Sequence, residues 1–367
     1  MTPAYRDDRL TVYQADVRDV LPEIEPGSVD AVVTSPPYWR ARHYLPTGHD
    51  LEALEIGREP TLVGWIETLV AIFGDLRRVL RPTGSLWVNL GDSYAAWGGQ
   101  RDDRKVIRRA SPAIRSPLSG YPPGTRRKSL LLAPYRFAIA MIEEGWILRD
   151  RVVWAKSNAI PDSARDRLAV RDEVFLRFTL ERFDAFDVGP IRVPAKQSSI
   201  ERSARAQGRH AKLTGVSRRT DPGRIEETPS SIVDREAGVY RYTGREAQRT
   251  MVNPGNVWTL PTASREAAGY EHFAMFPAEL VVRPILATVP EGGVVLDPFA
   301  GTGTVGDVAN RLGRRAILIE LNPASVDDIL RRTARERLEP IDWRALELGD
   351  PDGEAADPAP GLWEAVR

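Results

Sequence analysis

The sequence contains no cysteine in 367 residues. This absence excludes disulfide bonds, thiolate metal sites and every mechanism with a cysteine nucleophile. No apolar run approaches the ~18 residues of a membrane helix, and the N-terminus lacks the apolar stretch of a signal peptide. Histidine is scarce, and its four positions match no metal-ligand spacing. We therefore expect a cytoplasmic protein with no membrane partner and no metal site.

A net charge of either sign is also missing, because 51 basic residues balance 51 acidic ones. The balance hides segregation along the chain. Residues 101–128 hold nine basic and two acidic residues (net +7), residues 191–250 hold thirteen and seven (net +6), and residues 338–367 hold two and eight (net −6). The basic segments are either a surface for a polyanion or two solvated loops. The candidate contacts are Arg108, Arg109, Arg126, Arg127, Lys128, Arg218 and Arg219.

Hydrophobic periodicity predicts a chain of alternating strands and helices. Apolar residues recur near every 3.6 positions over residues 62–80, which indicates a helix. Further helices are expected over residues 130–144 and 277–288. Another should follow the strand at residues 294–297 and end near residue 312, and the last should begin at Pro323. The expected strands are residues 10–14, 29–34, 85–90, 146–154, 173–180, 294–297 and 316–320. This alternation predicts an α/β fold with a mostly parallel, doubly wound sheet.

A glycine-rich segment, VVLDPFAGTGTV at residues 294–305, joins an expected buried strand to a helix. Gly301 and Gly303 allow a ligand to approach the backbone closely. The next strand ends at Glu320, where an acid can accept hydrogen bonds from ribose hydroxyls. The segment lacks both GxGxxG and GK[ST], so a nucleoside without phosphates fits better than a dinucleotide or a triphosphate. A tight strand-to-helix turn without a ligand is the alternative.

A second segment, TSPPYW at residues 34–39, directly follows another expected strand. Its two prolines stiffen the backbone and remove two N–H groups, which leaves carbonyls as outward acceptors. Ser35 adds a hydroxyl, and Tyr38 adds a ring face. Acceptors beside a stacking ring suit a planar base with an exocyclic amine, whereas the alternative is a proline-rich turn.

Together these segments make the chain resemble the DNA amino-methyltransferases that use S-adenosylmethionine. The family's two hallmark motifs stand here as SPPY at residues 35–38 and DPFAGTGT at residues 297–304. HFAMFP at residues 272–277 resembles a cofactor segment of the family, and the resemblance extends over residues 10–190 and 255–335. The catalytic motif precedes the cofactor motif, which resembles the β class, a circular permutation of the usual order.

The resemblance implies a doubly wound, mostly parallel, Rossmann-like methyltransferase sheet that is circularly permuted and carries an inserted target-recognition region. The catalytic half would be residues 1–189 and the cofactor-binding half residues 256–337. Residues 190–255 would be the target-recognition insertion, and residues 338–367 an acidic, loosely ordered tail.

The resemblance also assigns roles. Tyr38 would stack on a base flipped out of the duplex, while the Ser35 hydroxyl and the Pro36 carbonyl accept hydrogen bonds from its amine. Glu320 would bind the cofactor's ribose and Asp16 its adenine. The implied catalytic residues are Ser35, Pro36, Pro37 and Tyr38, and the implied cofactor residues are Asp16, Phe276, Pro277, Asp297, Phe299, Gly301, Gly303, Thr304 and Glu320.

A serine at the first motif position accompanies cytosine N4 in the family, and aspartate more often accompanies adenine N6. Ser35 therefore favours cytosine N4, with adenine N6 as the alternative. Methylation at cytosine C5 is excluded, because it needs a cysteine. Less favoured alternatives are an RNA methyltransferase and an inactive DNA-binding protein. The implied partners are double-stranded DNA, a cognate restriction endonuclease and a second copy of the chain.

Overall fold

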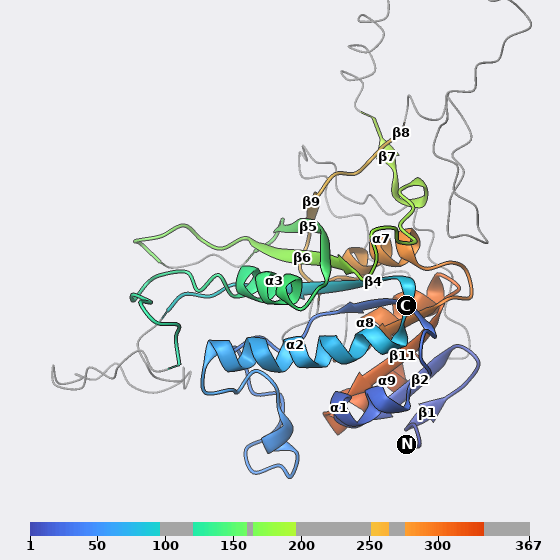
Figure 1. The fold of residues 1–367 in the computed structure, drawn as a ribbon, viewed down its shortest axis with the longest axis horizontal. Coiled ribbons are helices and arrows are strands. Elements are labelled where there is room, and N and C mark those ends of the chain that lie inside the picture. The colour runs from blue at the N-terminus through green and yellow to red at the C-terminus, as the bar shows by residue number, and fades with distance from the viewer. Residues whose placement is uncertain (96–119, 160–163, 196–250, 264–275, 334–367) are drawn as a thin grey trace, which may run out of the picture.

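The computed structural model describes residues 1–95, 120–159, 164–195, 251–263 and 276–333 (Figure 1). Four of the candidate DNA contacts (Arg108, Arg109, Arg218 and Arg219), most of the expected insertion and the whole acidic tail lie outside these residues. Within the described part of the chain, no helix is long and apolar enough to cross a membrane.

A nine-stranded sheet forms the centre of the molecule, in the order β1-β2-β11-β10-β3-β4-β6-β5-β9. The five neighbouring strands β2, β11, β10, β3 and β4 are parallel, whereas β1 and β6 run antiparallel to their neighbours. The strands are β1 Tyr5–Arg6, β2 Leu10–Gln14, β3 Val29–Thr34, β4 Leu80–Leu90, β5 Ile147–Lys156, β6 Asp172–Thr179, β9 Val257–Leu260, β10 Val294–Asp297 and β11 Arg315–Glu320. The expected Rossmann-like, mostly parallel sheet is thus confirmed.

Helices cover both faces of this sheet. On one face α1, α2 and α3 pack with Val32 of β3 and Leu296 of β10, and on the other α7, α8 and α9 pack with the alternating neighbours Val33 and Val295. The helices are α1 Val17–Val20, α2 Leu62–Val79, α3 Ala133–Glu143, α7 Ala278–Thr288, α8 Thr304–Arg311 and α9 Pro323–Thr333, with 3-10 turns η1 Leu21–Glu23, η2 Glu52–Leu54 and η3 Gly189–Ile191. Burial on both faces explains why all six residues of β3 are buried.

The boundary between α2 and β4 differs from the expectation. The helix ends at Val79, and the strand begins immediately at Leu80 rather than at Ser85. Leu80 pairs with Val29, and the register then shifts before Ser85 pairs with Ala31. Residues 81–84, between the expected helix and the expected strand, therefore form an irregular start of the strand, where the missing N–H of Pro82 is tolerated.

The permuted halves meet between β10 and β3, which pair in parallel although they lie far apart in the sequence. From β10 the chain passes through α8 to β11 on one side, and from β3 it passes through α2 to β4 on the other. Crossovers that diverge in this way open a crevice at the carboxyl ends of the two strands.

Of the expected insertion, the structure describes only residues 190–195 and residues 251–255, which lie at its two ends. There β7 (Val193–Pro194) and β8 (Met251–Val252) form a separate two-stranded antiparallel sheet.

Candidate active site

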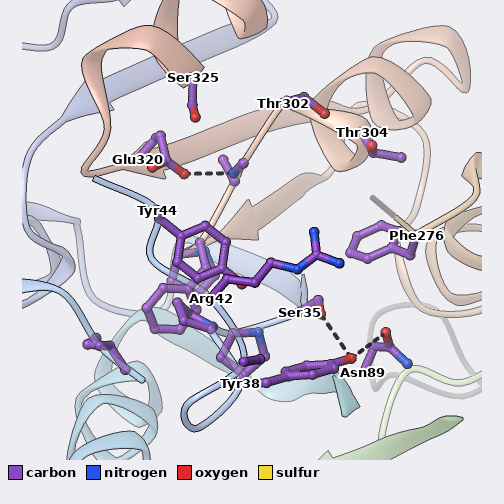
Figure 2. Close-up of a pocket in the computed structure, with 18 of the residues that line it drawn as sticks. Ser35, Tyr38, Arg42, Tyr44, Asn89, Phe276, Thr302, Thr304, Glu320 and Ser325 are labelled. Carbon is purple, nitrogen blue, oxygen red and sulfur yellow. Dashed lines mark hydrogen bonds between the residues drawn. The ribbon is translucent and has the colours of Figure 1, made fainter. Parts of the chain in front are cut away.

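A cavity of about 570 Å³ lies at the carboxyl ends of β10, β3 and their neighbours (Figure 2). Both sequence motifs reach it, although 259 residues or more separate them in the chain. Ten of the expected site residues line it: Asp16, Ser35, Pro36, Pro37, Tyr38, Phe276, Phe299, Gly301, Thr304 and Glu320. The cavity therefore has a glycine-loop end, built by β10, β11 and α8, and an SPPY end, built by β3, β4, β5 and β6.

The two glycines of the loop serve different purposes. Gly301 has a φ of 54° and faces open space, so that its backbone is accessible from the cavity. Gly303 also has a positive φ, of 80°, but a Cβ there would lie 3.1 Å from Ile329 of α9. Gly303 therefore permits close packing behind the loop, rather than contact with a ligand.

Glu320 ends β11 with its carboxylate directed at the cavity (Figure 2). One oxygen accepts the Gly301 N–H and the other the Asn322 N–H, both at 2.8 Å. Burial raises the pKa of this carboxyl to about 7. Each oxygen retains a lone pair, so the group can still accept hydrogen bonds from a bound hydroxyl.

Asp297 differs from the expectation, because it is buried behind the wall of the cavity rather than in it. Only 1% of its surface is exposed, and one carboxylate oxygen accepts both the Thr34 hydroxyl at 2.6 Å and the Phe299 N–H at 3.0 Å. Burial raises its pKa to about 7. Since Thr34 directly precedes Ser35, Asp297 connects the two motifs.

Pro277 also lies outside the cavity wall, because it caps the start of α7 while its neighbour Phe276 lines the cavity. Asp16 lines the cavity as well, and it caps α1 by accepting the Arg18 N–H at 2.8 Å. The Arg18 guanidinium pairs with the same carboxylate. The orientation of Asp16 is thus fixed by its own helix.

The SPPY segment is held by α2 and its preceding loop. The Trp65 indole donates to the Pro37 carbonyl at 2.9 Å, and the Trp39 indole donates to the Glu59 carbonyl at 2.9 Å. Trp39 is buried in the core under this segment. The segment is therefore anchored on the side away from the cavity.

The Tyr38 hydroxyl has three oxygen neighbours: Ser35 Oγ at 3.5 Å, Asn89 Oδ1 at 3.2 Å and Glu173 Oε2 at 2.8 Å. Burial and then the negative charge of Glu173 raise the Tyr38 pKa well above its usual value, so the phenol stays neutral. A Cβ at Gly91 would lie 2.9 Å from the Tyr38 ring, so only glycine leaves room for it there.

Several lining residues carry no signal in the sequence, among them Arg42, Lys156 and Glu173. In the view of Figure 2 the Arg42 side chain extends between Glu320 and Ser35. Glu173 lies at the start of β6 and reaches the site only because that strand is reversed. A strand's direction in the sheet cannot be read from its own residues.

Three of the candidate DNA contacts lie close to the SPPY end. Arg126 and Lys128 are exposed, and their segment pairs through its backbone with the residues that follow β4, Lys128 N donating to Ala95 O at 2.9 Å. Lys128 also forms an ion pair with Asp166, whereas the neighbouring Arg127 is half-buried. These residues therefore lie against the segment that follows β4, whose first residues, Gly91 and Asp92, line the cavity.

The permuted sheet and the cavity between its two motifs define a Rossmann-like methyltransferase. A family model described as DNA methylase, of the N6/N4 type, matches residues 29–331. The type II methyltransferase M.Cfr9I of Citrobacter freundii is 33% identical over 89% of this chain and 88% of its own, and M.SmaI of Serratia marcescens is 31% identical over 88% and 90%. The solved PvuII DNA methyltransferase (cytosine-N4-specific) superposes with a TM-score of 0.57 at 17% identity, over 94% of this chain and 93% of its own. The chain belongs to the N6/N4 family of DNA methylases, which use S-adenosylmethionine.

Proposed function

We propose that the protein transfers a methyl group from S-adenosylmethionine to the N4 amine of a cytosine flipped out of double-stranded DNA. The observation that carries this proposal is the single cavity that SPPY and the glycine loop share. A donor held at one end and a base held at the other would meet beside Ser35, at the junction of β3 and β10.

The residues at the glycine-loop end fit this cofactor. The Glu320 carboxylate can accept from both ribose hydroxyls, Asp16 can accept from the adenine amine, and the open backbone at Gly301 admits the methionine part beside Phe299 and Thr304. Phe276 adds apolar surface. When bound, the cofactor supplies a methyl group on a positively charged sulfur. We propose that Asp297 acts indirectly, by holding Thr34 and with it the start of SPPY.

At the other end the chain's own groups would orient the base. The Tyr38 ring gives a stacking face, and the Ser35 hydroxyl and the Pro36 carbonyl accept from the amine. These acceptors draw the nitrogen lone pair out of conjugation with the ring, which makes the nitrogen a nucleophile. The nitrogen then takes the methyl group directly: its bond to the methyl carbon forms as the carbon–sulfur bond breaks, a neutral thioether leaves, and the methylated nitrogen gives up one proton to water. The rate enhancement comes from positioning and from stabilising charge on the nitrogen.

The choice of cytosine depends on Ser35, because the family resemblance associates serine at this position with N4. The family covers both N4 and N6 methylases, so adenine N6 is the second candidate. A fold likeness at 17% identity does not identify the base.

The basic residues would hold the duplex through its phosphates. Arg126, Arg127 and Lys128 support this, since they lie beside the SPPY end, and we assign the same role to Arg108, Arg109, Arg218 and Arg219. The relatives named type II methyltransferases support a cognate restriction endonuclease as a further partner. A homodimer remains a proposal from the family resemblance.

The direct test is methyl transfer from radiolabelled S-adenosylmethionine to plasmid DNA, with RNA as a parallel substrate. We expect label in DNA and none in RNA. Binding of DNA without transfer would instead identify an inactive DNA-binding protein, and label in RNA alone would identify an RNA methyltransferase.

A further inference from the structure

An ion pair lies at the SPPY end of the cavity, between two residues that belong to neither of the family's motifs. Lys156, the last residue of β5, donates from Nζ to Glu173 Oε1 at 2.5 Å. Both side chains are largely buried, with exposed fractions of 20% for Lys156 and 16% for Glu173, and both line the cavity. Burying two charges costs free energy that an ion pair only partly returns, so a pair in this place suggests a task beyond stability.

The second oxygen of Glu173 has a partner of its own. Oε2 accepts the Tyr38 hydroxyl at 2.8 Å, across 135 residues of sequence. A phenol carries one proton, and of the three oxygens around this hydroxyl Glu173 is the nearest. The proton therefore goes to Glu173, and the lone pairs of the hydroxyl remain for Ser35.

The ring of Tyr38 has little other freedom. Gly91 lies against one ring edge, where a Cβ would come within 2.9 Å of the ring and 3.4 Å of the Glu173 side chain. Lys156 in turn lies 4.9 Å from the centre of the Trp154 ring, which limits the positions of its ammonium group. Trp154 fixes Lys156, Lys156 fixes Glu173, and Glu173 fixes the tip of Tyr38.

We propose that Glu173 is a positioning residue for methyl transfer: held by Lys156, its carboxylate fixes the Tyr38 ring at the angle on which the target base stacks. This inference depends on the proposed function, but not on the identity of the base, since cytosine and adenine both present a face to the ring. Glu173 acts through the Tyr38 hydroxyl and makes no contact with DNA that the reaction requires.

The test is a double-mutant cycle on methyl transfer under saturating DNA and cofactor. Glu173→Ala should lower kcat by about 10- to 100-fold, the size expected when a reacting group is misplaced by ~1 Å. The KM for S-adenosylmethionine should stay near its wild-type value, whereas the melting temperature should fall because Lys156 loses its ion-pair partner. Glu173→Gln keeps one acceptor for the hydroxyl but loses the ion pair with Lys156, so it should lower kcat less than Glu173→Ala does.

Tyr38→Phe provides the second arm, because it keeps the ring and removes the hydroxyl. In this background Glu173→Ala should change kcat by less than about twofold, since the two residues act as one unit. If the two losses multiply, Glu173 acts on the substrate directly and the proposal is wrong. Wild-type kcat in Glu173→Ala would also overturn it.

Lys156→Gln tests the same chain of interactions if Glu173→Ala fails to fold, and its loss should likewise vanish in the Tyr38→Phe background. Asp328→Asn is the matched control, because it breaks the Arg331 ion pair on α9 at a residue that does not line the cavity, and should leave kcat unchanged. Wild-type protein that transfers no methyl group to DNA would refute the proposed function itself. Active wild-type protein with an equally active Glu173→Ala variant would refute this inference alone.

Discussion

The two ends of the cavity are built by different means. At the glycine-loop end, backbone groups fix the key side chain: the Glu320 carboxylate is held by two N–H groups of neighbouring turns. At the SPPY end, side chains hold side chains, and the Tyr38 hydroxyl depends on Glu173 of another strand. Backbone hydrogen bonds survive most substitutions, whereas a side-chain network fails when one member is removed. Because the base would bind at the SPPY end and the cofactor at the glycine-loop end, point mutations at the SPPY end should lower the rate. Point mutations at the glycine-loop end should lower the affinity for the cofactor.

The largest effect is expected at the SPPY end. Ser35→Ala removes an acceptor of the amine, and Tyr38→Ala removes the stacking face. Ser35→Ala should slow methyl transfer by at least ~100-fold, taking a positioned polar group as about 2.7–4 kcal/mol. Tyr38→Ala should slow it by about 5- to 150-fold, taking stacking as about 1–3 kcal/mol. Calorimetry should find cofactor affinity unchanged in both variants. If affinity falls with the rate, the two ends are not separable.

At the glycine-loop end, Gly301→Val and Glu320→Ala should weaken cofactor binding. The valine forces a β-branched side chain into a positive φ, and the alanine removes the hydrogen bonds to the ribose. The loss should be about 1–3 kcal/mol in binding free energy for Glu320→Ala, with a folded protein in both cases. Unchanged affinity in both variants would contradict the site as assigned.

The junction of the two ends should respond to Thr34→Val, which keeps the shape of the residue and removes the donor to Asp297. A buried acceptor that loses a partner costs about 1–3 kcal/mol, so the free energy of unfolding should fall by that amount. Thr34→Ser keeps the hydroxyl and removes the methyl group, so it is the control for packing. Equal losses in the two variants would mean that packing, rather than the hydrogen bond, explains the effect.

The buried carboxyls Asp297 and Glu320 should also give a pH dependence. Their pKa values are raised to about 7 in the folded protein, whereas in the unfolded chain they are near ~4. The folded state then binds more protons between these values, so stability should fall as pH rises from about 4 to about 7. Denaturant unfolding across this range should find a shallower fall in Asp297→Asn. An identical pH profile in that variant would remove Asp297 as a cause.

The smallest effects are expected for the basic side chains that would neutralise the phosphates of DNA. Affinity for DNA should fall steeply as salt rises, and replacing Arg126 and Lys128 with neutral residues should reduce the salt slope by ~0.9 for each phosphate that is no longer neutralised. The same holds for Arg218 and Arg219, with little change in thermal stability. Asp166→Asn frees Lys128 from its ion pair and should not weaken binding. An affinity that does not depend on salt would make the basic segments solvated loops.

The glycine-loop end was predictable from sequence, because its parts are local. The strand, the loop and the acid that ends the next strand all lie within residues 294–320, and the structure brings Gly301 and Glu320 into direct contact. Asp297 was expected in the cavity, and its buried bond to Thr34 was not predictable, since the partner lies 263 residues away.

The SPPY end was predictable only in its motif. Ser35 and Tyr38 were identified, but Lys156, Glu173 and Arg42 were not. Glu173 is the second residue of a strand, which in a wholly parallel sheet would lie at the far edge. The reversal of β6 brings it to the cavity, and such a reversal is a property of the whole sheet.

The central claim is that SPPY and the glycine loop form one methyl-transfer site for the N4 amine of cytosine. The most direct measurement is to treat unmethylated plasmid DNA with the protein and S-adenosylmethionine, digest it to nucleosides, and identify the modified nucleoside by mass and chromatography against standards. The account predicts N4-methylcytosine, absent when Ser35→Ala replaces the wild type. N6-methyladenine, or no modified nucleoside at all, would contradict it.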